Sequence, residues 1–102
     1  MTDPLLEELR SQYRESARLR LEEVGELLDG ARTSSPAQLE ALARHFHAFA
    51  GMGATYGFPR ISELGNELER AIGPVVDGGT PPDPATLARW RELVREIAAE
   101  LC

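Results

Sequence analysis

Apolar residues recur every three or four positions along four stretches of the chain, which is the spacing of α-helices that bury one face. We predict helices over residues 4–29, 36–56, 59–72 and 84–101. No stretch alternates apolar and polar residues for long enough to predict a β-strand. The residues predicted to face the core are, in chain order, Leu6, Leu9, Tyr13, Ala17, Leu21, Val24, Leu28, Leu39, Leu42, Ala43, Phe46, Phe49, Ala50, Ile61, Leu64, Leu68, Ile72, Leu87, Trp90, Val94, Ile97 and Leu101.

Prolines mark the starts of the predicted helices. In three of them the proline directly follows a residue that readily caps a helix, and proline is favoured at the first helical position. The third helix begins at Pro59, where the preceding Phe58 is a poor cap. The three capped starts are Asp3-Pro4, Ser35-Pro36 and Asp83-Pro84.

The remaining boundaries decide the number and order of helices. Apolar spacing is weak over residues 11–16, so the first segment is either one helix or a short helix followed by a longer one. Gly73 and Pro74 predict the end of the third helix, which leaves residues 75–83 as a loop. Short connections near residues 30–35 and 57–58 favour antiparallel neighbours. The predicted fold is therefore all-α: an antiparallel up-down four-helix bundle, with or without a short extra N-terminal helix.

Composition narrows the class of protein. The length of 102 residues predicts a single domain over residues 1–102. A net charge of −6 argues against a nucleic-acid partner, since such proteins normally present a basic face. The sequence has neither a signal peptide nor an apolar run of about 18 residues, so we expect a cytoplasmic protein with no membrane association. Its one cysteine, Cys102, fits a reducing compartment, and the chain is either a complete small protein or a domain of a longer one.

The two histidines, His45 and His47, lie on opposite margins of the apolar face of the second helix. On a helical wheel they fall about 90° and about 110° from the centre of that face. Residues two positions apart on a helix do not face each other, so the pair is a poor chelator. The sequence contains no second group of ligands, and we predict neither a metal site nor a cofactor.

The helix surface next to His47 is predicted to be bare. Helical side chains lean toward the amino terminus, so residues three, four and seven positions after the histidine would be those that cover it. These residues are Ala50, Gly51 and Ala54. Gly51 therefore leaves the imidazole open to a partner molecule.

Two further glycines follow closely. Gly53 falls on the core side of the helix and predicts a close helix crossing, and Gly57 predicts the turn before Pro59. The residues alone leave an alternative open, in which the glycines serve only helix packing and His47 is an ordinary surface side chain.

The stretch "HAFAGMGATYGF" resembles the core motif of the histidine phosphotransfer (HPt) domain family. That motif has a histidine, an apolar residue two positions on, a glycine four on and a second glycine ten on. Here these residues are His47, Phe49, Gly51 and Gly57. The following "PRISELGNELERAI" resembles the next helix of the family, including its Leu-Glu pair at Leu68-Glu69.

The resemblance implies a function. HPt domains are helical bundles that carry a phosphoryl group on one exposed histidine in two-component relays, without turnover of their own. They receive the group from a histidine kinase or exchange it with the aspartate of a receiver domain. By motif position the phosphorylated residue here would be His47 and not His45. Neither the particular partner nor the direction of transfer follows from the motif.

One position departs from the family pattern. Many members have a lysine three residues after the histidine, where this chain has Ala50. A cation there would help to hold a phosphate. Arg44, one turn before His47, and Arg60, at the start of the next helix, are the candidates to supply charge instead. The alternative function is a degenerate HPt-like bundle that docks a receiver or kinase without being phosphorylated.

Overall fold

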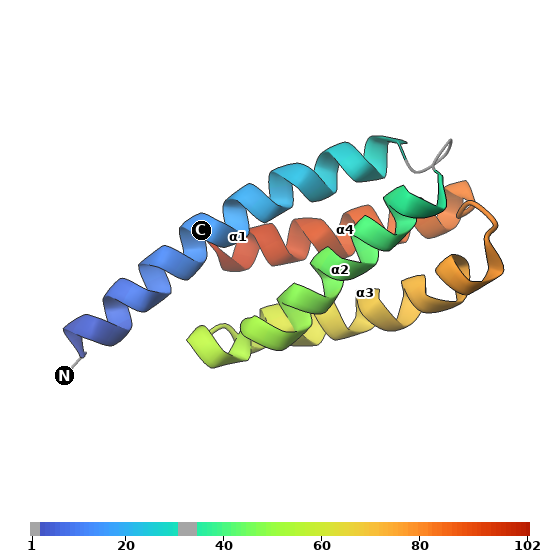
Figure 1. Ribbon diagram of the computed structural model, residues 1–102. Helices are drawn as coiled ribbons and strands as arrows, with labels where there is room; N and C mark the ends of the chain where they lie inside the picture. Colours follow the sequence, from blue (N-terminus) through green and yellow to red (C-terminus); the bar gives the residue numbers. More distant parts are fainter. Residues whose placement is uncertain (1–2, 31–34) are drawn as a thin grey trace.

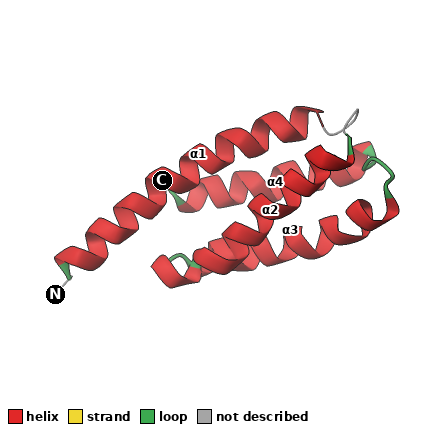
Figure 2. Cartoon of the chain, viewed as in Figure 1, coloured by secondary structure: helices red, strands yellow, loops and turns green. Residues whose placement is uncertain are grey.

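The computed structural model describes residues 3–30 and 35–102, and helices make up most of this part of the chain (Figures 1 and 2). No strand occurs among the described residues. The predicted connection through residues 31–34 lies outside them. The elements are α1 (Pro4–Gly30), α2 (Pro36–Met52), the 3-10 turn η2 (Ala54–Tyr56), α3 (Pro59–Gly78) and α4 (Pro84–Glu100).

The four helices form an elongated bundle of 49 × 21 × 20 Å (Figure 1). Consecutive helices run antiparallel, because residues late in one helix contact residues early in the next. Between α2 and α3, for example, Gly53 lies against Ser62 while His47, earlier in α2, contacts Glu69, later in α3. The predicted all-α bundle is confirmed.

Side-chain caps begin three of the helices, as predicted. Asp3 accepts a hydrogen bond from the Leu5 amide, and Asp83 accepts one from Thr86. At the start of α2 the Ser35 hydroxyl accepts from the Gln38 amide, and the Gln38 side chain accepts from the Ser35 amide. These bonds satisfy amide groups that have no partner within the first helical turn.

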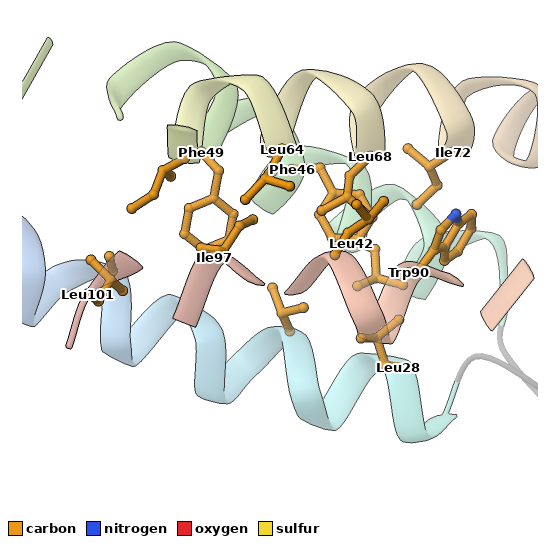
Figure 3. Close-up of a cluster of buried hydrophobic side chains, with 14 of the residues drawn as sticks. Leu28, Leu42, Phe46, Phe49, Leu64, Leu68, Ile72, Trp90, Ile97 and Leu101 are labelled. Carbon is orange, nitrogen blue, oxygen red and sulfur yellow. The ribbon is translucent and has the colours of Figure 1, made fainter. Parts of the chain in front are cut away.

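The core lies along the bundle axis and takes side chains from all four helices (Figure 3). Trp90 of α4 is 1% exposed and meets the ring of Phe46 edge-on, with 6.1 Å between ring centroids. The predicted apolar positions of α3, and those of α2 other than Ala50, lie in or against this core. In α4, Leu93 is fully buried whereas the predicted Val94 is only partly so, which the apolar spacing did not distinguish.

The amino-terminal part of α1 corrects two predicted core positions. Leu6 and Leu9 are 46% and 38% exposed, although they continue the apolar stripe of this helix. The reason is that α4 ends beside Arg18, whose guanidinium donates to the Leu101 carbonyl at 3.3 Å. The first turns of α1 extend past that point, as Figure 1 shows, and α1 is one continuous helix without a separate N-terminal one.

Two predicted helix ends were also wrong. The predicted stop at Gly73 and Pro74 is absent, since α3 continues to Gly78 and ends where Gly79 adopts a φ of 66°. Pro74 removes only one amide donor and lies on the exposed side, while Val75 and Val76 pack against the core and favour another turn of helix.

Helix α2 ends at Met52, earlier than the predicted residue 56. The chain then tightens into η2 and turns at Gly57, whose φ of 89° is costly for any residue with a Cβ atom. The turn returns the chain directly into α3, so that α2 and α3 pack side by side and carry the candidate site.

Candidate functional site

His47 projects from α2 into solvent with 75% of its side chain exposed. Its Nδ1 atom is in close contact with the Oε2 atom of Glu69 on α3. An ionised carboxylate has no proton to donate and can only accept hydrogen bonds. Nδ1 therefore carries the ring proton and donates it to Glu69. Among the described residues, no group hydrogen-bonds to Nε2. The arrangement therefore presents Nε2, with its lone pair, to the outside.

The packing of α2 on α3 places Glu69 beside the histidine. A Cβ atom on Gly65 would stand 2.4 Å from the backbone nitrogen of Ala50 and 2.9 Å from its Cα atom. Only a glycine allows the two helices to approach so closely. Glu69 follows Gly65 by one helical turn, on the same face of α3, so this crossing determines where its carboxylate lies.

Neither the close contact at Gly65 nor the role of Glu69 was predicted from the sequence. Gly65 carried a usable signal, because it lies four residues after Ile61 and three before Leu68 on the apolar face of α3. A glycine at such a position often marks a close helix contact. Glu69 had no such signal, since many exposed helix positions in this chain are acidic.

Gly51 leaves open space beside the histidine, as predicted. A Cβ atom added there would meet no atom within 4 Å, whereas one on Gly53 would stand 2.8 Å from the Ser62 nitrogen. Gly51 is therefore free of any packing role, and Gly53 has the predicted close crossing. Ala54, at the start of η2, is also exposed. Ala50 is partly buried against Gly65 and presents no charge to His47.

The two arginines suggested as phosphate partners differ in position. Arg44 is exposed, lies one turn before His47 on α2, and pairs with no acidic side chain of residues 3–30 and 35–102. Arg60 binds Glu63 at 3.1 Å and Glu96 at 3.5 Å. It precedes Glu69 by nine residues, which is about 13 Å along a helix. Arg60 is therefore remote from the histidine along the bundle, whereas Arg44 lies one turn from His47 on α2 and lines the groove that contains His45.

His45 differs from His47 in its exposure and in the contacts of its ring nitrogens. Only 14% of its side chain is exposed, and both ring nitrogens are engaged by residues of α1. Burial lowers the pKa of His45, with Arg20 and Arg44 acting in the same direction and Glu23 opposing them. Both ring nitrogens of His45 are therefore already in contact with α1, whereas Nε2 of His47 has no hydrogen-bond partner among the described residues.

Among the described residues, no group of three or more His, Cys, Asp or Glu side chains is placed to hold a metal ion. Within the same residues, no helix is both long and apolar enough to cross a membrane.

The sequence motif implied an exposed histidine on α2, and His47 is exposed; the carboxylate of α3 at its Nδ1 atom is a feature that the motif did not indicate. Comparison with protein families supports the same assignment: the family model described as "Hpt domain" matches residues 8–100. The chain belongs to the Hpt domain family. No curated protein and no solved structure matched the chain.

Membership in the Hpt family gives the general role. Hpt domains are phosphocarriers, rather than enzymes, in two-component phosphorelays, where they interact with kinases or receiver domains. The match spans α1 through α4, so it covers the whole bundle and not the histidine motif alone.

Proposed function

We propose that this Hpt domain carries a phosphoryl group on Nε2 of His47, between a histidine kinase and the aspartate of a receiver domain or between two receivers. The observation that carries the proposal is the pair of unequal ring nitrogens. Nδ1 is held by Glu69, and Nε2 is exposed. The domain has no turnover of its own in this role, and the cytoplasmic setting predicted from the sequence is part of the proposal.

The chemistry needs little more than an oriented ring. The Nε2 lone pair attacks the phosphorus of the donor, a P–N bond forms, and the donor's P–O bond breaks with its electrons staying on the leaving oxygen. The Nδ1 proton remains in place, so the ring becomes positively charged as the bond forms. The Glu69 carboxylate faces that developing charge and stabilises it. Reversal of the same steps returns the phosphoryl group to an aspartate.

The surface beside His47 is suited to docking a partner. Gly51 and Ala54 have no side chain large enough to cover this surface, and Met52 at the end of α2 is 45% exposed. Met52 and Leu9 also line an open groove of about 290 Å³ between α1 and α2. A receiver that approaches His47 over Gly51 would find apolar surface there, and Arg44 lies one helical turn before the histidine on α2.

The second candidate is docking without phosphorylation, and the absence of a cation at Ala50 motivates it. The two candidates differ in a single observable. A receiver or kinase would bind the protein in either case, but only the phosphocarrier would take up phosphate.

The chain offers a matched test of the proposal in its two histidines. The wild-type protein, His47→Gln and His45→Gln are each incubated with an active histidine kinase or a phosphorylated receiver domain, and acid-labile phosphate is measured. We expect labelling of the wild type and of His45→Gln, and none of His47→Gln. Label retained by His47→Gln would overturn the assignment. Binding of the receiver without any label on the wild type would favour the docking module.

Glu69 provides a second prediction. Substitution with alanine removes the acceptor of the Nδ1 proton, so both tautomers of the ring become populated. It also removes the negative charge that stabilises the positively charged ring in the transition state. We expect Glu69→Ala to slow labelling of His47 by roughly 10-fold or more, by analogy with other carboxylates that orient a functional histidine. Glu69→Gln retains an acceptor oxygen but no charge, so its labelling rate should lie between those of the wild type and Glu69→Ala. Equal rates for all three proteins, measured as initial rates of phosphate uptake, would show that Glu69 does not act on the ring.

A further inference from the structure

His45 joins α1 to α2 through both of its ring nitrogens. Nδ1 lies 2.8 Å from Nη1 of Arg20, and Nε2 lies 3.1 Å from Oε2 of Glu23. Arg20 and Glu23 are three residues apart and therefore neighbours on the surface of α1. One imidazole of α2 thus spans two side chains of α1.

The partners determine the protonation state of this ring. A guanidinium can only donate hydrogen bonds, so Nδ1 must accept the one from Arg20. Nε2 then carries the single ring proton and faces the Glu23 carboxylate, 3.1 Å away. The arrangement consequently requires a neutral His45.

Protonation would break the arrangement. A second ring proton would go to Nδ1, where it would remove the acceptor and place a positive ring against the Arg20 guanidinium. Glu26 of α1 lines the groove that contains His45; the charged groups that act on the ring are Arg20 and Glu23 of α1 and Arg44 of α2. Glu23 is the only one that favours the charged form, and its side chain is 65% exposed, so water screens its effect.

We propose that His45 is a pH-dependent latch between α1 and α2, closed while the ring is neutral and released when the ring is protonated. Arg20 lines both the groove beside His45 and the open groove that contains Leu9 and Met52. When Arg20 is released from His45, the surface between α1 and α2 therefore changes in both grooves. The proposal concerns a different histidine from the phosphate carrier and does not depend on phosphotransfer.

The direction of the effect follows from the lowered pKa of His45. As pH falls, the unfolded chain binds a proton at the ordinary value of about 6.5, before the folded protein does. The stability that the latch contributes is therefore complete above about pH 6.5 and is lost as pH falls from there toward the folded value.

Thermal unfolding at about pH 7.5 and about pH 5.5, on either side of the ordinary histidine pKa, tests the proposal. Gln is neutral at both pH values and reproduces one acceptor and one donor. We expect the Tm of the wild type to fall between the two pH values by roughly 3 °C or more beyond the fall seen in His45→Gln. The control variant His47→Gln should behave like the wild type. Equal falls in the wild type and His45→Gln would overturn the proposal.

A direct titration of the His45 ring by NMR gives a second measurement that does not depend on the global Tm. Arg20→Met keeps an apolar stem against α2 and removes the guanidinium. We expect the pKa of His45 to rise in this variant relative to the wild type, because the repulsion and the fixed Nδ1 acceptor are both lost. An unchanged pKa would show that Arg20 does not hold the ring neutral and that the latch is absent.

Discussion

Gly65→Ala is expected to lower the free energy of unfolding by about 3 kcal/mol, because its new Cβ atom cannot fit between α2 and α3. That atom would stand 2.4 Å from the Ala50 nitrogen, where the obstacle is backbone and cannot rotate away. The helices must then separate, and Glu69 moves away from His47. Unfolding followed by circular dichroism measures the loss, which corresponds to a fall in Tm of well over 10 °C for a domain of this size.

Gly51→Ala is the matched control for that result. Both glycines lie within helices, but a Cβ atom at position 51 meets nothing within 4 Å. Helix propensity alone should then stabilise the protein by up to about 1 kcal/mol. If Gly65→Ala were as stable as Gly51→Ala, the close crossing of α2 and α3 would not be what positions Glu69.

Gly51→Leu is expected to separate folding from function. Leucine forms helices better than glycine, and the space at position 51 is open, so the Tm should be maintained or raised. The leucine side chain leans toward the amino terminus and so toward His47, where it occupies the approach of a partner. We expect phosphotransfer from a receiver to slow by about 10- to 100-fold, as misplacement of reacting groups commonly does.

The control for this effect is Gly51→Ala, which should transfer phosphate nearly as fast as the wild type. A marked fall in the Tm of Gly51→Leu would mean that Gly51 serves packing after all. Transfer at the wild-type rate by a folded Gly51→Leu protein would place the docking surface elsewhere.

The bundle and the exposed position of His47 could be predicted from the sequence because both depend on local spacing. Apolar positions at helical intervals identified four helices, and the wheel placed His47 at a margin with bare neighbours. The burial of the first leucines of α1 was mispredicted because they have regular apolar spacing, but α4 ends before it can cover them. The extension of α3 past Pro74 likewise depends on the core contacts of Val75 and Val76.

The partner of the histidine could not be predicted because it comes from another helix. Glu69 lies 22 residues after His47, and the two meet only at the register that the Gly65 crossing allows. The same holds for His45, whose contacts with Arg20 and Glu23 depend on the register of α1 against α2. Helical spacing distinguishes inside from outside, whereas these contacts depend on how two helices are aligned.

The most direct test of the account is to identify the phosphorylated atom. The protein is labelled with ¹⁵N in its histidine rings, phosphorylated by an active kinase or a phosphorylated receiver, and examined by NMR for coupling between phosphorus and ring nitrogen. We predict a single phosphohistidine, with the phosphoryl group on Nε2 of His47 and the proton retained on Nδ1. Phosphate on His45, on Nδ1 of His47 or on a residue other than histidine would contradict the account.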